Sequence, residues 1–390
     1  MHPFHLPDPR LFPVYEPEGA SSNPLIELAL ASLAAEQGVI QEKRDAALRE
    51  AMAAQLVASE VTPIADALAR APSLAVQRHL TRTLAHAHVE AGRARGDAGL
   101  PTTVFALPVV MVAGNAAPIT VPGALPNVDE LVALMKGAAA LRGNQSFGLS
   151  NALAAAQTFA LDRLPATLDW WCLGPGTPIA IERAPLVVPG NQESVFLRFL
   201  VGTAVAGPGV DLLTDVDCGK WGMPFTQAVA RQLGGGGLSL LAMPRPPRAP
   251  LAALFQGRAA QREVSLQLFA TNAIRKFRSS VGEPAAVISA HRTASGGEVR
   301  LSLSNPFDEK GAEGFQAELF ATDRAQDIAL IMQDLLRECG VESVTTLADV
   351  FADIDPATKL PLLFRADALE LAQSHALDAQ RAVSAGVRTH

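Results

Sequence analysis

Residues 103–114 constrain the fold more strongly than any other part of the chain. From Val104 to Val112 this stretch is almost wholly apolar and rich in β-branched residues, and it ends at Gly114. A short run that is apolar on both faces and bounded by turn residues is typical of a strand buried on both sides. We therefore expect it at the centre of a sheet. Pro108 has no amide hydrogen for the ladder, which favours a bulge or a position near a sheet edge.

Composition places the chain among ordinary globular proteins. Of its 390 residues, 49% are hydrophobic and 18% are charged, and this length is enough for two or three domains. The net charge of −7 does not favour nonspecific binding to nucleic acid or to an anionic membrane. The start has no signal-peptide pattern, and no apolar run is long enough to span a bilayer. We therefore expect a cytoplasmic protein, and the abundant alanine and arginine indicate a GC-rich bacterial genome.

No cofactor motif stands out. The three cysteines, Cys172, Cys218 and Cys339, are too widely spaced for a disulfide framework or a structural zinc site. Lys220 follows Gly219, but the first glycine and the hydroxyl residue of a phosphate-binding loop are missing. The glycine run at residues 234–237 follows an expected helix, the reverse of a dinucleotide-binding loop. We therefore expect no cofactor.

The order of the expected elements divides the chain into five parts. They are a proline-rich arm at 1–22, a helical region at 23–101, α/β units at 102–243 and 244–348, and a C-terminal extension with a terminal helix at 349–390. Each unit gives a strand, a helical stretch, a strand pair, a helix, a glycine stop and a strand. We predict an α+β (α/β-like) fold, with two tandem ferredoxin-like βαββαβ units behind the helical region. The alternative is that the halves share a common element order by coincidence.

Capping and turn residues define several elements of the first half. Asn127 and Glu130 form a capping-box-like pair at the start of a helix. The stretch around Ser150 lacks the preceding strand of a nucleophile elbow, so Ser150 fits the cap of another helix better. Residues 179–188 and 194–204 are predicted to be two strands of one hairpin.

The second half shows similar signals. We expect a long helix at 250–281, a hairpin of residues 286–291 with 299–304, and a helix at 324–339 that is ended by Gly340.

The densest acidic cluster beside glycines consists of Asp211, Asp215 and Asp217. Asp215 and Asp217 begin like a calcium loop, but Thr226 stands where an EF-hand needs a bidentate carboxylate. Carboxylates before a helix also have a structural use at its positive end. We therefore predict no metal site and retain these three aspartates as the candidates for one.

Charge is unevenly distributed along the chain. Residues 245–278 hold seven basic side chains against Glu263 alone, whereas residues 308–370 hold 14 acidic side chains against five basic ones. The acidity of the chain is therefore concentrated in its last quarter.

The long helix should present one basic side. At 100° per residue, Arg258, Arg262 and Arg275 share an exposed stripe. The opposite side, expected to face the sheet, carries Ala260, Val264, Leu268, Thr271, Ile274, Phe277 and Val281. Guanidinium groups match carboxylate and phosphate geometry, so the functional interpretation of the stripe is an anionic partner, an acidic protein surface before nucleic acid. The alternatives are a solvated face or pairing with the acidic last quarter.

Two classes of function remain open. The first is a non-catalytic cytoplasmic protein-binding or scaffold protein that engages partners through charged faces. The second is an enzyme or small-ligand-binding protein with its site at the carboxyl end of the buried 104–112 strand, near Gly114, Asn115 and Asn127. The lack of a recognisable nucleophile, metal set or cofactor loop favours the first. The sequence leaves catalysis and the oligomeric state undecided.

Overall fold

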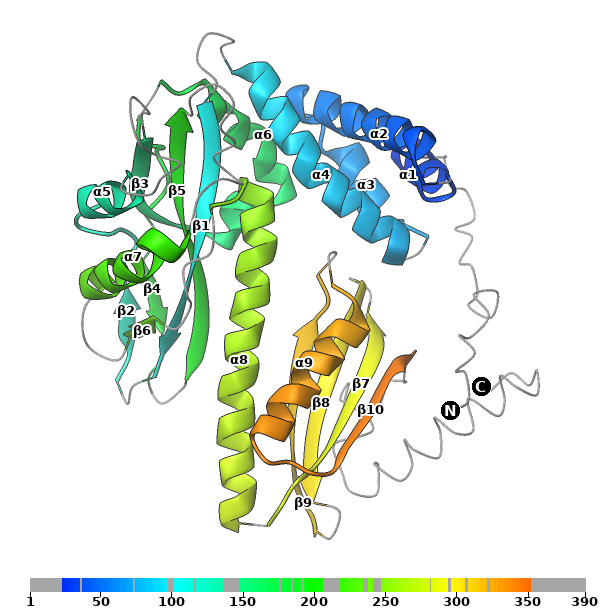
Figure 1. Cartoon of the computed structure of the whole chain (residues 1–390), viewed down its shortest axis with the longest axis vertical. Helices are drawn as coiled ribbons and strands as arrows, with labels where there is room; N and C mark the ends of the chain where they lie inside the picture. Colours follow the sequence, from blue (N-terminus) through cyan, green and yellow to red (C-terminus); the bar gives the residue numbers. More distant parts are fainter. Residues whose placement is uncertain are drawn as a thin grey trace. The chain divides into compact units, whose positions relative to one another are not determined.

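The computed structural model describes residues 23–35, 37–72, 74–96, 102–114, 117–136, 147–174, 177–183, 185–188, 190, 193–205, 218–233, 238–240, 247–280, 282–293, 296–305, 308–320 and 323–351. These residues form a mixture of helices and strands (Figure 1), in agreement with the α+β prediction. They fall into two compact units. The first unit comprises residues 22–71 and 75–265, and the second includes the chain from residue 266 onward.

Four helices open the first unit: α1 (Pro24–Leu33), α2 (Val39–Val57), α3 (Thr62–Ala69) and α4 (Leu74–Arg95). Asn23 caps α1, because its side-chain oxygen accepts a hydrogen bond from the Leu25 amide at 3.0 Å. The Asn23 amide also donates to the Pro63 carbonyl at 2.9 Å, which ties α1 to α3. The cap therefore fixes both the start of α1 and its contact with the next helices.

The sheet of the first unit is built around β1 (Thr102–Ala113), as the apolar run predicts. All twelve residues of β1 are buried. It pairs along its whole length with antiparallel β5 (Ser194–Val205), and the strand order is β3-β5-β1-β6. The outer strands are β3 (Phe147–Ala155) and β6 (Leu238–Leu240). The strand identified first in the sequence is thus an inner strand of the sheet.

Pro108 sits where its missing amide hydrogen costs no bond to β5. The Ala106 amide donates to the Arg248 carbonyl at 2.8 Å, on the side of β1 away from β5. Two residues further on, the ring nitrogen of Pro108 lies on that same side. Among the described residues, pairing with β6 begins there only at Met111. The proline therefore occupies a gap in the ladder rather than a bulge.

Both faces of this sheet are covered. One face of β1 shares a core with α4 and the early part of α8 (Pro250–Ser280), and the other with α5 (Asp129–Lys136) and α7 (Cys218–Leu233). The rest of the unit comprises β2 (Ile119–Val121), η3 (Ala156–Phe159), η4 (Leu161–Arg163), α6 (Leu164–Thr167), η5 (Leu168–Cys172) and β4 (Leu186–Val188).

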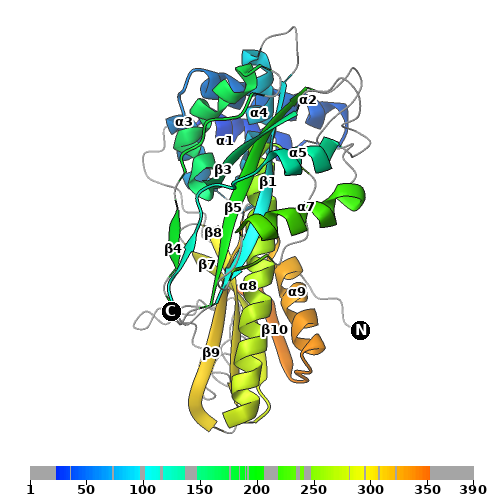
Figure 2. The same cartoon turned by 90° about the vertical axis from the view of Figure 1, so that its left-hand side faces the viewer.

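The second unit is a four-stranded sheet with helices on its apolar face (Figures 1 and 2). Its strand order is β10-β7-β8-β9, and β10 runs parallel to β7. The elements after α8 are β7 (Ala285–Thr293), β8 (Gly296–Asn305), β9 (Asp308–Glu318), α9 (Ala325–Glu338) and β10 (Val344–Phe351). The predicted hairpin is present as β7 and β8, which pair from Ala285–Ser304 to Thr293–Gly296.

The prediction of two tandem ferredoxin-like units is not confirmed. Numbered along the chain, the strands of the first sheet lie in the order 4-1-3-2 and those of the second in the order 4-1-2-3. In a ferredoxin-like sheet the first and third strands lie side by side and antiparallel, as β1 and β5 do, whereas the second sheet places its first strand between its second and its fourth. The last strand is antiparallel to the first in one sheet and parallel in the other.

Two local predictions for the first unit were wrong. Ser150 lies within β3, buried, and does not cap a helix; pairing of β3 with β5 overrides its capping preference. The predicted hairpin of residues 179–188 with 194–204 is also absent from the described residues, because β4 pairs with β2 in a separate two-stranded sheet.

Candidate functional site

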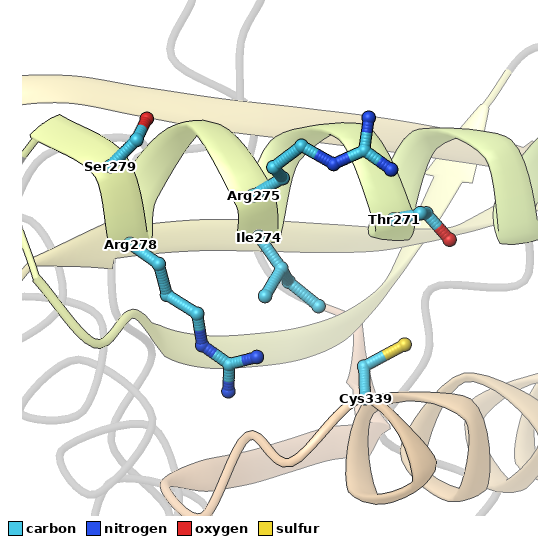
Figure 3. A pocket seen from close by; sticks show the side chains of 6 residues that line it. All are labelled: Thr271, Ile274, Arg275, Arg278, Ser279 and Cys339. Carbon is cyan, nitrogen blue, oxygen red and sulfur yellow. The ribbon is translucent and has the colours of Figure 1, made fainter.

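A pocket of about 580 Å³ lies between the C-terminal half of α8 and the end of α9 (Figure 3). It belongs entirely to the second unit. Its lining consists of Thr271, Ile274, Arg275, Arg278, Ser279 and Cys339. The first five come from α8, and Cys339 is the C-cap of α9.

The helical repeat brings the α8 residues to one side of the helix. Thr271, Arg275 and Arg278 follow one another at intervals of four and three residues, so they lie on one face. Ile274 is 3% exposed and belongs to the core beneath the helix. The polar residues thus border the apolar stripe that packs on the sheet.

Arg278 is held in place by three contacts. Its Nε lies 3.0 Å from both carboxylate oxygens of Glu283, and its Nη2 donates to the Gly340 carbonyl at 3.1 Å. Gly340 ends α9 with φ +77°, in the left-handed region that favours glycine. A Cβ there would lie 3.2 Å from Nη2 of Arg278. Glycine therefore serves both the helix end and the close approach of the arginine.

Arg275 differs from its basic neighbours. Lys276 pairs with Glu313 and Arg278 with Glu283. Arg275 is exposed and makes no ion pair or side-chain hydrogen bond with the described residues. Among the described residues, Arg275 is therefore the pocket cation that no carboxylate neutralises.

The pocket combines an apolar middle with one arginine, Arg275, that no described carboxylate neutralises. In Figure 3 the side chains of Arg275 and Arg278 extend in different directions from α8, and Ile274 lies between them. The thiol of Cys339 faces α8 from the other side. Exposed guanidinium–carboxylate pairs contribute only about 0–1 kcal/mol each, so the apolar middle must supply much of any binding free energy. Such a site fits an apolar side chain with a carboxylate beside it.

The three arginines of the predicted stripe are not equally exposed. Arg258 and Arg262 are half-buried in the first unit, and each interacts with another group of the chain. Only Arg275 is exposed, in the second unit, where it lines the pocket. The pocket therefore contains one of the three predicted partner-binding residues.

The residues of the alternative site have structural roles where they are described. Gly114 ends β1, and a Cβ there would lie 3.2 Å from Cγ of Glu193. Asn127 caps α5, because its side-chain Oδ1 accepts a hydrogen bond from the backbone amide of Asp129 at 3.1 Å. The backbone amide of Asn127 donates to Oε1 of Gln232 in α7 at 3.0 Å. Asn115 lies outside the described residues.

The acidic candidates Asp211, Asp215 and Asp217 also lie outside the described residues. Among the side chains that are described, no group of three His, Cys, Asp or Glu residues is placed to hold a metal ion. Likewise, none of the described helices has the length and apolar character needed to cross a bilayer.

The second sheet also has a buried polar face, which was not predicted from the sequence. On β7, Ser289 Oγ lies 2.8 Å from Nε2 of His291. On the neighbouring strand β8, Arg300 forms an ion pair with Glu298. Register places Ser289 opposite Arg300 and His291 opposite Glu298. The signal was present as polar residues at every second position of β8, the period of one strand face: Glu298, Arg300, Ser302 and Ser304.

Comparisons of the chain with protein-family models, with curated proteins and with solved structures found no match. The function therefore rests on the chemistry of the site.

Proposed function

We propose that this chain is a cytoplasmic protein-binding protein that holds an acidic segment of a partner in the pocket between α8 and α9. The observation that carries the proposal is Arg275, an exposed guanidinium group at the pocket that has no carboxylate partner among the described residues. Both neighbouring cations are neutralised by Glu313 and Glu283. An acidic group of a partner would therefore bind on the side of the pocket where Arg275 lies.

The partner segment needs an apolar anchor as well as a negative charge. Ile274 and Cys339 give the pocket an apolar middle, and burying one large aliphatic side chain contributes about 1.5–3 kcal/mol. Charge at the rim then selects the partner and orients it, because rim ion pairs affect specificity and association rate more than affinity.

Site-specific cross-linking in the native cell tests the proposal. A photo-reactive amino acid at Thr271, which lines the pocket, should capture the partner. Arg275→Glu should abolish that product. Arg163→Glu provides a matched control, because this side chain is 71% exposed and belongs to the first unit. Equal cross-linking in the two variants would exclude the pocket as a partner site.

A further inference from the structure

The exposed side of α9 carries a segment of the kind that the pocket fits. Leu330 and Ile331 are 56% and 41% exposed, a large exposure for adjacent aliphatic side chains. Asp327 lies one turn before them and Asp334 one turn after, and both are exposed. Residues at these spacings share one helix face. An apolar pair flanked by two carboxylates thus projects from the second unit.

Few interactions hold the carboxylates of Asp327 and Asp334 in place. Asp334 contacts only Arg337 among the described residues, at 3.6 Å, with both side chains more than 60% exposed. A pair at this exposure contributes about 0–1 kcal/mol. Asp327 makes no ion pair or side-chain hydrogen bond with the described residues. Docking against a cationic surface therefore breaks little that stabilises the chain.

Helix geometry prevents α9 from filling the pocket of its own chain. Leu330 precedes Cys339 by nine residues, which at 100° per residue places the two side chains on opposite sides of the helix axis. Cys339 faces the pocket, so Leu330 points away from it. The segment can reach only the pocket of another molecule.

We propose that the partner segment held in the pocket is α9 of a second copy of this chain. The proposal rests on the proposed function and names the partner. Leu330 and Ile331 supply the apolar anchor, and a flanking carboxylate, Asp327 or Asp334, pairs with Arg275 at the pocket rim. Because the donor face and the pocket lie on different sides of α9, the contact is head-to-tail. Such a contact extends into a chain or ring of copies and does not stop at an isologous pair.

Sedimentation velocity over a concentration series tests self-association of the full chain. The sedimentation coefficient should rise with protein concentration and fall when salt is added. Leu330→Glu and Arg275→Glu should each weaken association at least about tenfold, from the value of one buried aliphatic side chain and the introduced repulsion. Arg163→Glu should associate like the wild type. Circular dichroism confirms that each variant is folded.

Charge reversal gives the decisive experiment. The double variant Asp327→Arg/Asp334→Arg should be monomeric alone, as should Arg275→Glu. Mixed together, the two should associate again, since each pocket then meets an α9 of opposite charge. A wild type that stays monomeric, or a mixture that does not associate, overturns the proposal. If a different protein is still cross-linked at Thr271 in an Arg275-dependent way, only this inference fails and the proposed function stands.

Discussion

Nε2 of His88 lies 2.7 Å from Oγ1 of Thr167 in the buried contact between α4 and α6. The Thr167 hydroxyl donates to the Leu164 carbonyl, also at 2.7 Å, so its hydrogen is already used. His88 must therefore donate from Nε2, which leaves Nδ1 unprotonated. Nδ1 is buried and has no partner among the described residues, and burial lowers the pKa of His88 to about 4.

This contact predicts a pH-dependent stability. The unfolded chain binds a proton on His88 near the ordinary pKa of 6.5, whereas the folded chain excludes it until about pH 4. The free energy of unfolding should therefore fall as the pH drops below 6.5, and the loss should be complete below about 4. It amounts to about 3 kcal/mol. Urea unfolding at several pH values should show this difference between the wild type and His88→Gln. Parallel pH profiles would contradict it.

A second prediction concerns Gly92 of α4. An added Cβ there would lie 2.4 Å from Cε2 of Trp171, whose indole is buried against the helix. Alanine normally favours a helix over glycine by about 1 kcal/mol, but the clash should make Gly92→Ala destabilising by about 1–3 kcal/mol. His86→Ala, at an exposed position of the same helix, serves as the control and should be nearly neutral. Thermal unfolding decides; a Gly92→Ala variant as stable as the wild type would show that the indole can move aside.

Two of the buried serines of the second sheet, Ser289 and Ser302, should respond differently to alanine. Ser289 is hydrogen-bonded to His291, so Ser289→Ala should cost about 1–3 kcal/mol. Ser302 is equally buried, but its hydroxyl has no partner among the described residues. Ser302→Ala should therefore be neutral or stabilising. Comparing the free energies of unfolding of these two variants measures the hydrogen bond, and equal losses would rule out this interpretation.

The buried ion pair on the same face gives a fourth prediction. Arg300 is 4% exposed and its partner Glu298 is 13% exposed. Arg300→Met leaves a buried carboxylate without its counter-charge and should cost about 3–5 kcal/mol. Adding Glu298→Leu should recover most of that loss, since an apolar pair of similar volume can replace a buried ion pair. Chemical unfolding of the single and double variants provides the measurement. A double variant no more stable than the single one would mean that the pair is needed for more than its charges.

Elements with strong local signals could be predicted from the sequence. The apolar run gave β1 and its burial, and the glycine after residue 339 marked the end of α9. Asn127 was correctly identified as a helix cap. Each of these features depends on residues that are close together in the sequence, so it can be predicted without knowing the tertiary structure.

Strand order could not be obtained in this way. Ser150 has the local character of a cap but lies in β3, because pairing with β5, about 50 residues away, decides its conformation. The prediction of which side of α8 is buried was only partly correct. Ala260, Ile274 and Phe277 are buried, but Thr271 is exposed. One helical periodicity was applied to a helix that contributes to two different cores, so the predicted stripe could not fit both.

The candidate site was predictable only in part. The excess of basic residues near 245–278 pointed to Arg275, which lines the pocket. Cys339 and the fixing of Arg278 by Gly340 required knowledge that α8 and α9 are neighbours. Contacts between segments about 60 residues apart leave no local trace in the sequence.

The shared helix α8 has a consequence for how the chain is made. Leu251 and Ala260 join the core of the first unit, so this part of α8 finds its partners among residues already synthesised. Leu266, Ile274 and Phe277 join the second core, whose strands and α9 are still to come. At roughly 5–20 residues per second, the nascent chain exposes this apolar half-helix for several seconds. The ribosome-bound intermediate therefore keeps this apolar surface in water until the second core can form.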